Sequence, residues 1–135
     1  MNADELLKEA RGSSVAALRL GKDIVNGDVE LPIGKMIEAF SIIYQIYLGY
    51  GKEYDEAKTE QEKERSLHWL NMFQKLVNDF YEVFFDFEIE ILSYLSELKK
   101  SEMTEEQVRV VKNFLKACQK DENLLAELRN FELAE

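Results

Sequence analysis

The stretch from Glu60 to Lys100 constrains the fold most, because it contains neither glycine nor proline, the residues that most often interrupt a helix. Apolar residues recur in it three or four positions apart, which keeps them on one face of a helix with 3.6 residues per turn. They are Trp69, Phe73, Leu76, Phe80, Phe84, Phe87, Ile91, Tyr94 and Leu98. The pattern predicts one long helix over residues 60–100.

The length of this helix raises a packing problem. Thr59 with Glu62 three residues later predicts a capping box at its start, and Lys99 and Lys100 suit the negative end of its dipole. Its 41 residues would extend about 60 Å, whereas a compact chain of this length is about 40 Å across. We therefore expect that the helix bends near residues 84–86, that the molecule is elongated, or that a second copy covers the overhang.

The apolar face of this helix is also wide. At about 100° per residue, a second apolar flank lies beside the main stripe. It consists of Leu67, Leu70, Tyr81, Phe85, Leu92 and Leu95. A surface helix of a small monomer needs a narrower stripe, so the pattern predicts contacts on two sides of the helix.

Two helices are expected before this stretch. Residues 3–25 follow helical spacing, with Gly21 filling a gap in the stripe. The run Gly12-Ser13-Ser14 either lies at a close helix crossing or divides the segment into two helices, and the undivided form is favoured. After a turn at Asn26-Gly27-Asp28, Pro32 suits the start of a helix to about residues 54–57 that is apolar almost all round.

The C-terminal part predicts one or two more helices. Thr104 with Gln107 repeats the capping-box pattern and opens a fourth helix. A short last helix after residues 119–121 would bury Leu124, Leu125, Leu128 and Phe131. No strand pattern is visible. The chain therefore predicts an all-α fold, a four- to five-helix bundle in one domain (1–135) with the long helix at its centre.

The charge balance limits the partners. The net charge is −10, with 27 acidic and 17 basic residues and no cluster of Lys or Arg. Nucleic acids and anionic membranes need such clusters, so we expect no direct nucleic-acid or membrane binding. An acidic surface would instead attract a basic protein partner.

Targeting signals and disulfide patterns are missing from the sequence. The N-terminal residues lack the basic head and apolar core of a signal peptide, and no run approaches about 18 apolar residues. The single cysteine, Cys118, excludes an intramolecular disulfide and suits a reducing compartment. These features predict a cytoplasmic protein.

No motif predicts catalysis. The one histidine, His68, is expected on the surface, and the Glu-x-x-His pairs of di-metal helix bundles are absent. Phosphate loops, serine elbows and zinc spacings are also absent. Cys118 falls on the apolar stripe of its helix, as expected for a buried, inert thiol. We therefore expect no catalytic residue, cofactor or metal, and a protein that is not an enzyme.

Acidic residues of the long helix provide a possible docking strip. Asp79, Glu82, Asp86 and Glu90 form a row that is most simply a solvated face, with a strip for a basic partner or a carboxylate metal site as less favoured alternatives. Glu88 instead falls on the second apolar flank. We expect it at a solvent-exposed edge, rather than in a buried pair with a base or tyrosine, or in a functional role.

The aromatic residues of the second helix have two explanations, of which core packing is the favoured one. Tyrosines recur at three- and four-residue steps in the second helix, which is explained by core packing with hydroxyls at the rim or, more specifically, by a protein interface. The candidate interface residues are Ile42, Tyr44, Ile46, Tyr47, Tyr50, Tyr54, Tyr81, Phe85 and Leu92.

Three functions are compatible with these features. The favoured one is a non-enzymatic acidic interaction or scaffold protein, a homo-oligomer that dimerises through the aromatic faces of its second and third helices. The first alternative is an acidic inhibitor or nucleic-acid mimic that occupies a basic groove. The second is a small-molecule-binding or enzymatic bundle, with a closed cavity that reaches Glu88 or a tyrosine hydroxyl.

Overall fold

A computed structural model describes residues 2–118, and within them it contains six helices and no strand. The helices are α1 (Ala3–Gly12), α2 (Ser14–Val25), α3 (Ile33–Glu56), α4 (Glu60–Asp86), α5 (Glu88–Lys100) and α6 (Glu105–Cys118). The all-α bundle expected from the sequence is confirmed, with slightly more helices than the expected four to five. The short helix expected after residues 119–121 lies outside the described residues.

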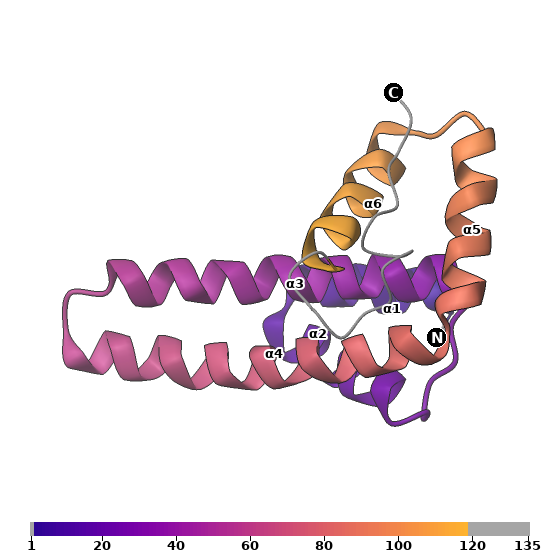
Figure 1. The fold of residues 1–135 in the computed structure, drawn as a ribbon. Coiled ribbons are helices and arrows are strands. Elements are labelled where there is room, and N and C mark those ends of the chain that lie inside the picture. Colours follow the sequence, from indigo (N-terminus) through magenta and orange to yellow (C-terminus); the bar gives the residue numbers. More distant parts are fainter. Residues whose placement is uncertain (1, 119–135) are drawn as a thin grey trace.

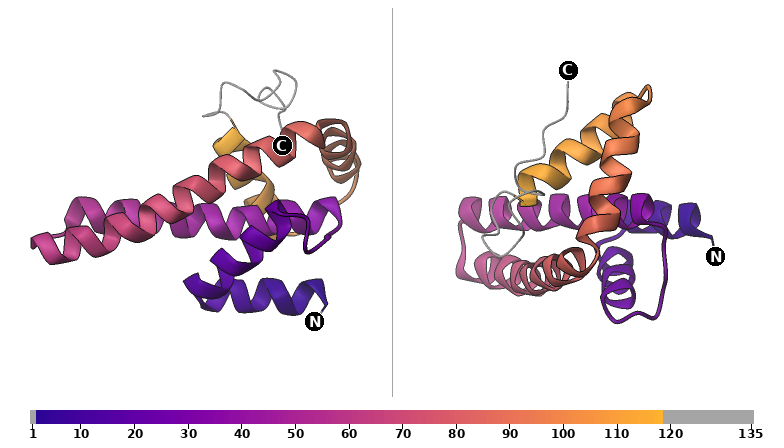
Figure 2. Two further views of the ribbon diagram at one scale, coloured as in Figure 1. Left: turned by 90° about the horizontal axis from the view of Figure 1, so that it is seen from below. Right: turned by 45° about the vertical axis from the view of Figure 1, so that its right-hand side comes forward.

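A long antiparallel pair, α3 and α4, forms the centre of the molecule (Figure 1). Helix α3 contacts each of the other five described helices. Helices α1 and α2 pack on one side of the pair, whereas α5 runs away from it and α6 returns to it (Figures 1 and 2). The sequence of α3 is apolar almost all round, and α3 is the helix with neighbours on most sides, as that pattern indicates.

The first helical segment divides at Ser13, so the favoured prediction of an undivided helix is wrong. Ser13 is extended (φ −153°, ψ 125°), and its hydroxyl accepts a hydrogen bond from the Ala16 N–H at 3.2 Å. Glycine disfavours helix interiors, and a serine N-cap satisfies a backbone donor that would otherwise lack a partner. The division lets α1 bury Ala10 and α2 bury Ala17 along two different axes.

The close helix crossing that the sequence suggested lies elsewhere, at Gly21. A Cβ atom added there would lie 2.5 Å from Leu76 Cδ2 and 2.8 Å from Ile43 Cδ1. Helix α2 therefore approaches α3 and α4 so closely that only a glycine fits without displacing these two side chains. The buried Gly21 fills the gap in the stripe as predicted.

The long helix is not continuous, because it breaks at Phe87 into α4 and α5. Phe87 (φ −108°, ψ 21°) still donates to the carbonyls of Val83 and Phe84, at 3.1 and 3.2 Å. The expected bend is thus present, one residue after the suggested 84–86. After the turn Ile91 is completely buried, and Tyr94 of α5 lies against Gly34 at the start of α3. Phe87, expected on the buried stripe, is 40% exposed.

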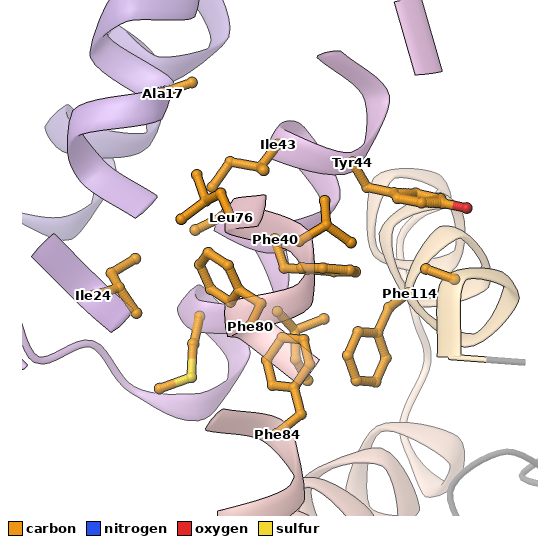
Figure 3. Close-up of a cluster of buried hydrophobic side chains, with 14 of the residues drawn as sticks. Ala17, Ile24, Phe40, Ile43, Tyr44, Leu76, Phe80, Phe84 and Phe114 are labelled. Carbon is orange, nitrogen blue, oxygen red and sulfur yellow. The ribbon is translucent and has the colours of Figure 1, made fainter. Parts of the chain in front are cut away.

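Aromatic rings fill the core where α3, α4 and α6 meet (Figure 3). The Phe40 ring lies edge-on to those of Phe84 and Phe114, with centroids 5.0 and 6.0 Å away, and 5.5 Å from the ring of Phe80. All four rings are fully buried. Buried aromatic pairs of this kind add to the stability given by apolar burial, so this cluster anchors the three helices.

Local signals place the remaining helix ends as expected. The Thr59 hydroxyl accepts from the Glu62 N–H at 3.1 Å, and Thr104 and Gln107 form both bonds of a capping box, at 3.1 and 2.9 Å. Gly27 has a positive φ of 80° in the predicted turn, a conformation in which glycine is favoured. These ends depend on residues within one turn of each position, which is why the sequence predicts them.

Candidate interaction surfaces

The nine candidate interface residues differ widely in exposure. Phe85 is exposed at 48%, whereas Tyr44 is buried at 4%. The other seven are half-buried, namely Ile42, Ile46, Tyr47, Tyr50, Tyr54, Tyr81 and Leu92. The chain thus covers much of this set with its own helices.

Two of these tyrosines use their hydroxyls within the chain. Tyr81 donates to the Ala117 carbonyl of α6, and Tyr50 donates to Ser14 Oγ of α2, each at 3.0 Å. The Tyr50 ring also stacks on Trp69, with centroids 5.7 Å apart and planes at 9°. These contacts tie α3 and α4 to the smaller helices and leave the apolar surface of the pair open at its two ends.

One end is a projecting two-helix arm, which we define as residues 48–70. Figure 1 shows α3 and α4 extending together beyond the other helices. Leu48 and Leu67 lie at similar distances from the connection between the two helices and are 43% and 39% exposed. Six acidic and four basic residues are mixed along the arm, and His68 is exposed there, as expected.

The other end is the corner where α4 turns into α5, which we define as residues 82–90. Phe85, Phe87 and Ile89 are 48%, 40% and 80% exposed. The chain has no Lys, Arg or His between Lys75 and Lys99, so this corner carries acidic charge alone.

The predicted acidic row is divided by the corner. Asp79 pairs with Lys75 at 3.0 Å. Glu82, Asp86 and Glu90 are exposed, and none of them forms an ion pair with another residue of the range 2–118. Because the helix breaks at Phe87, these three carboxylates follow a bend instead of one straight helix face.

Glu88 is buried at 8% exposure, so its predicted place at an exposed edge is wrong. The break makes it the first residue of α5. A carboxylate there is stabilised by the positive end of the helix dipole. The sequence alone did not predict this place for Glu88, because nothing in it indicates that a helix begins at residue 88.

A groove of about 600 Å³ lies between α3, α5 and α6. Its apolar lining includes Ile37, Leu98 and Val111. The groove is open to solvent, unlike the closed cavity envisaged for a small-molecule site. Glu88 does not line it, whereas a tyrosine, Tyr94, does. At its edge the Tyr94 ring crosses Gly34, where an added Cβ atom would lie 2.6 Å from the tyrosine oxygen. Burial raises the pKa of Tyr94 above its usual value.

Charged residues around this groove pair with one another. Lys35 Nζ lies 2.9 Å from Asp4 and 3.5 Å from Glu38, and Arg11 also pairs with Glu38. The hydrogen bond between Lys35 and Asp4 lowers the pKa of Asp4 and raises the pKa of Lys35. The network connects α1 to α3, so its charges stabilise the fold and are not available as a ligand site.

Comparison of the chain with protein-family models, with curated proteins and with solved structures finds no match. Within residues 2–118, no three His, Cys, Asp or Glu side chains are placed to hold a metal ion. No helix in that part of the chain is long and apolar enough to span a membrane. The arm and the corner are therefore the features on which we base a function.

Proposed function

We propose that this protein is a non-enzymatic, acidic interaction protein that forms a homodimer through its arm. The observation that carries the proposal is the exposure of Leu48 and Leu67, one on each helix of a projecting pair. Large apolar side chains exposed on both helices of a projecting hairpin are surface that a partner can remove from water.

The geometry of a two-helix arm supports this proposal. Two helices can bury only the stripes that face each other, and the arm carries large apolar or aromatic side chains on both helices, including Leu48 and Tyr54 on α3 and Leu67 on α4. Smaller helices cover one side of α3 as far as Tyr50, where Ser14 of α2 contacts it, and the tip of the arm extends beyond them (Figure 1). A second arm packed against the first would form a four-helix bundle, in which Leu48 and Leu67 of each copy leave water.

The charges of the arm are compatible with self-association. A two-fold interface places the same patch on both copies, so a patch of one sign would repel itself. The arm instead mixes basic residues, such as Lys63 and Arg65, with acidic neighbours such as Glu62 and Glu64. Opposite charges can therefore meet across the two-fold axis.

The test is the mass of the particle in solution for the full chain and a double variant. Light scattering at micromolar concentration should give twice the chain mass of 15.8 kDa for the unmodified protein. Leu48→Asp with Leu67→Asp should give the single-chain mass, because four carboxylates would enter the interface. Both positions are exposed, so the helix content should persist by circular dichroism.

A matched control is Phe85→Asp with Ile89→Asp, which adds the same charge at the corner. This variant should keep the dimer mass. A single-chain mass for the unmodified protein over this concentration range would overturn the proposal. A dimer mass retained by the Leu48→Asp, Leu67→Asp variant would show that copies associate through another surface.

A further inference from the structure

Exposed apolar side chains are concentrated at the corner. Six large apolar residues of the described chain are exposed, and three of them, Phe85, Phe87 and Ile89, lie within five consecutive positions. Ile89, at 80%, is the most exposed of the six. Single exposed apolar residues are ordinary, whereas three within one turn of the chain are a concentration that makes this turn a candidate interaction site.

The fold does not require these three side chains. The turn is held from inside by Phe84 and Ile91, both at 0% exposure, and the Phe84 ring packs on Phe40 and Phe114. Small or polar residues at positions 85 and 89 would leave those contacts unchanged. The corner therefore has apolar surface beyond what its own packing uses.

The surroundings of this apolar group have one sign of charge. Glu82, Asp86 and Glu90 are exposed in the same nine residues and form no ion pair with any other residue in the range 2–118. Three carboxylates this close together create a strong negative potential at the corner. Positively charged groups of a partner would be attracted to it. The chain supplies no basic residue between positions 76 and 98.

The charge decides between the possible occupants. A second copy would set the same carboxylates against each other with no basic residue between them, so the patch would repel itself. Nucleic acid and anionic lipid are disfavoured for the same reason. A basic segment with apolar side chains on one side would satisfy both the apolar group and the acidic rim.

We infer that the corner is a docking site for a basic amphipathic segment of a different protein. Apolar side chains of that segment pack on Phe85, Phe87 and Ile89, and its Lys or Arg residues pair with Glu82, Asp86 and Glu90. The site goes beyond the proposed self-association. Because arm and corner are at opposite ends of α4, a dimer would present two such sites (Figure 1).

The experiment measures binding of a defined probe to the full chain. The probe is a fluorescein-labelled peptide of about 14 residues of leucine and lysine, patterned as an amphipathic helix with a 3.6-residue period. A peptide of the same composition without that pattern serves as the reference. Fluorescence anisotropy should show at least tenfold tighter binding of the patterned peptide.

Two corner variants separate the apolar and charged contributions. Phe85→Ala with Ile89→Ala, and separately Glu82→Gln, Asp86→Asn and Glu90→Gln together, should each weaken binding of the patterned peptide about tenfold or more. The matched control neutralises three exposed acids of the arm, Glu53→Gln, Glu56→Gln and Glu64→Gln, and should change binding less than twofold. Circular dichroism would check that all variants remain helical.

Each outcome decides the inference. If neutralising the corner and neutralising the arm weaken peptide binding equally, the peptide is attracted by net charge alone. If the Phe85→Ala, Ile89→Ala variant binds the peptide as well as the unmodified protein, the apolar side chains do not contribute. Either result overturns the inference. Light scattering on the same corner variants should still give the dimer mass. Failure of the corner site and failure of the arm dimer are therefore distinguishable.

Discussion

The arm and the corner are the two ends of helix α4, and both expose large apolar side chains, yet they favour different partners. At the arm, Leu48 and Leu67 lie among acidic and basic residues, which is compatible with the dimer that we propose. At the corner, Phe85 and Ile89 lie among carboxylates alone. In our two proposals, the exposed apolar side chains locate the contact and the surrounding charge selects the partner.

The two ends also differ in how the rest of the chain supports them. The corner lies beside the aromatic core, since Phe84 is fully buried against Phe40 and Phe114. The arm is held at its base by the Tyr50–Trp69 stack and the hydrogen bond from Tyr50 to Ser14. Near the corner, a side chain that faces the core is expected to stabilise the fold, and one that faces solvent is free to bind a partner. Substitutions at adjacent positions that face opposite ways test this difference.

The largest expected effect separates the two phenylalanines at the end of α4. Phe84→Ala should lower the free energy of unfolding by about 3–5 kcal/mol, because it leaves a cavity among buried rings. Phe85→Ala, at a position 48% exposed, should change it by no more than about 0.5 kcal/mol. Urea denaturation followed by circular dichroism measures both. Similar losses in the two variants would contradict the assignment of Phe85 to a binding surface.

A smaller effect compares a glycine that packs against α5, the helix after the corner, with a glycine of the arm. At Gly34, beneath the ring of Tyr94 on α5, an added methyl group must displace that ring, so Gly34→Ala should cost about 1–3 kcal/mol. Gly49, in the arm, has no atom within 4 Å of the added Cβ position. Gly49→Ala should therefore stabilise the protein by about 0.5–1 kcal/mol through helix propensity. Thermal unfolding measures both changes, and a loss of stability in Gly49→Ala would indicate that the arm is already covered there.

The smallest effect concerns the attachment of α5, and hence of the corner, at alkaline pH. Burial and the nearby Glu38 raise the pKa of Tyr94 above 10.0, although Lys35 opposes this. A raised folded-state pKa contributes stability that is fully present below pH 10 and is lost as the pH rises through that pKa. The raised pKa of Lys35 acts in the same direction above 10.5.

Between pH 8 and pH 11, the unmodified protein should therefore lose more unfolding free energy than Tyr94→Phe, which has no phenol to ionise. Urea denaturation at a series of pH values measures the two slopes. Parallel slopes would show that the Tyr94 contact with α3 does not contribute to holding α5.

Several features follow from residues close together in the chain. The helical periodicity over residues 60–86, the caps at Thr59 and Thr104, and the turn at Gly27 each depend on neighbours within one or two turns. Such interactions act wherever the rest of the chain lies, and these features were predicted. The acidic residues and Phe85 of the corner were also identified as surface candidates from their positions on the helix.

The breaks were harder to predict because local signals and packing compete there. Gly12 and Ser13 carried a breaking signal, yet the choice between a crossing and a break depends on whether Ala10 and Ala17 can both reach the core. At Phe87 no glycine or proline signals a break at all. Leu48 was not predicted as an interface residue, since its exposure depends on which side of α3 the smaller helices cover: α2 reaches Tyr50, two residues further along α3, and Leu48 is still exposed.

The sequence by itself determined that this chain is helical, where most helices begin and end, and that its surface is acidic. These properties depend on periodicity, capping and composition, which are local or additive. Only the tertiary structure decided that α4 ends at Asp86, that Glu88 is buried, and that Phe87 and Ile89 face water. The reason is that a side chain can be buried only where a neighbouring helix lies beside it. For α4 that neighbour is α3, and it begins near the point where α4 ends.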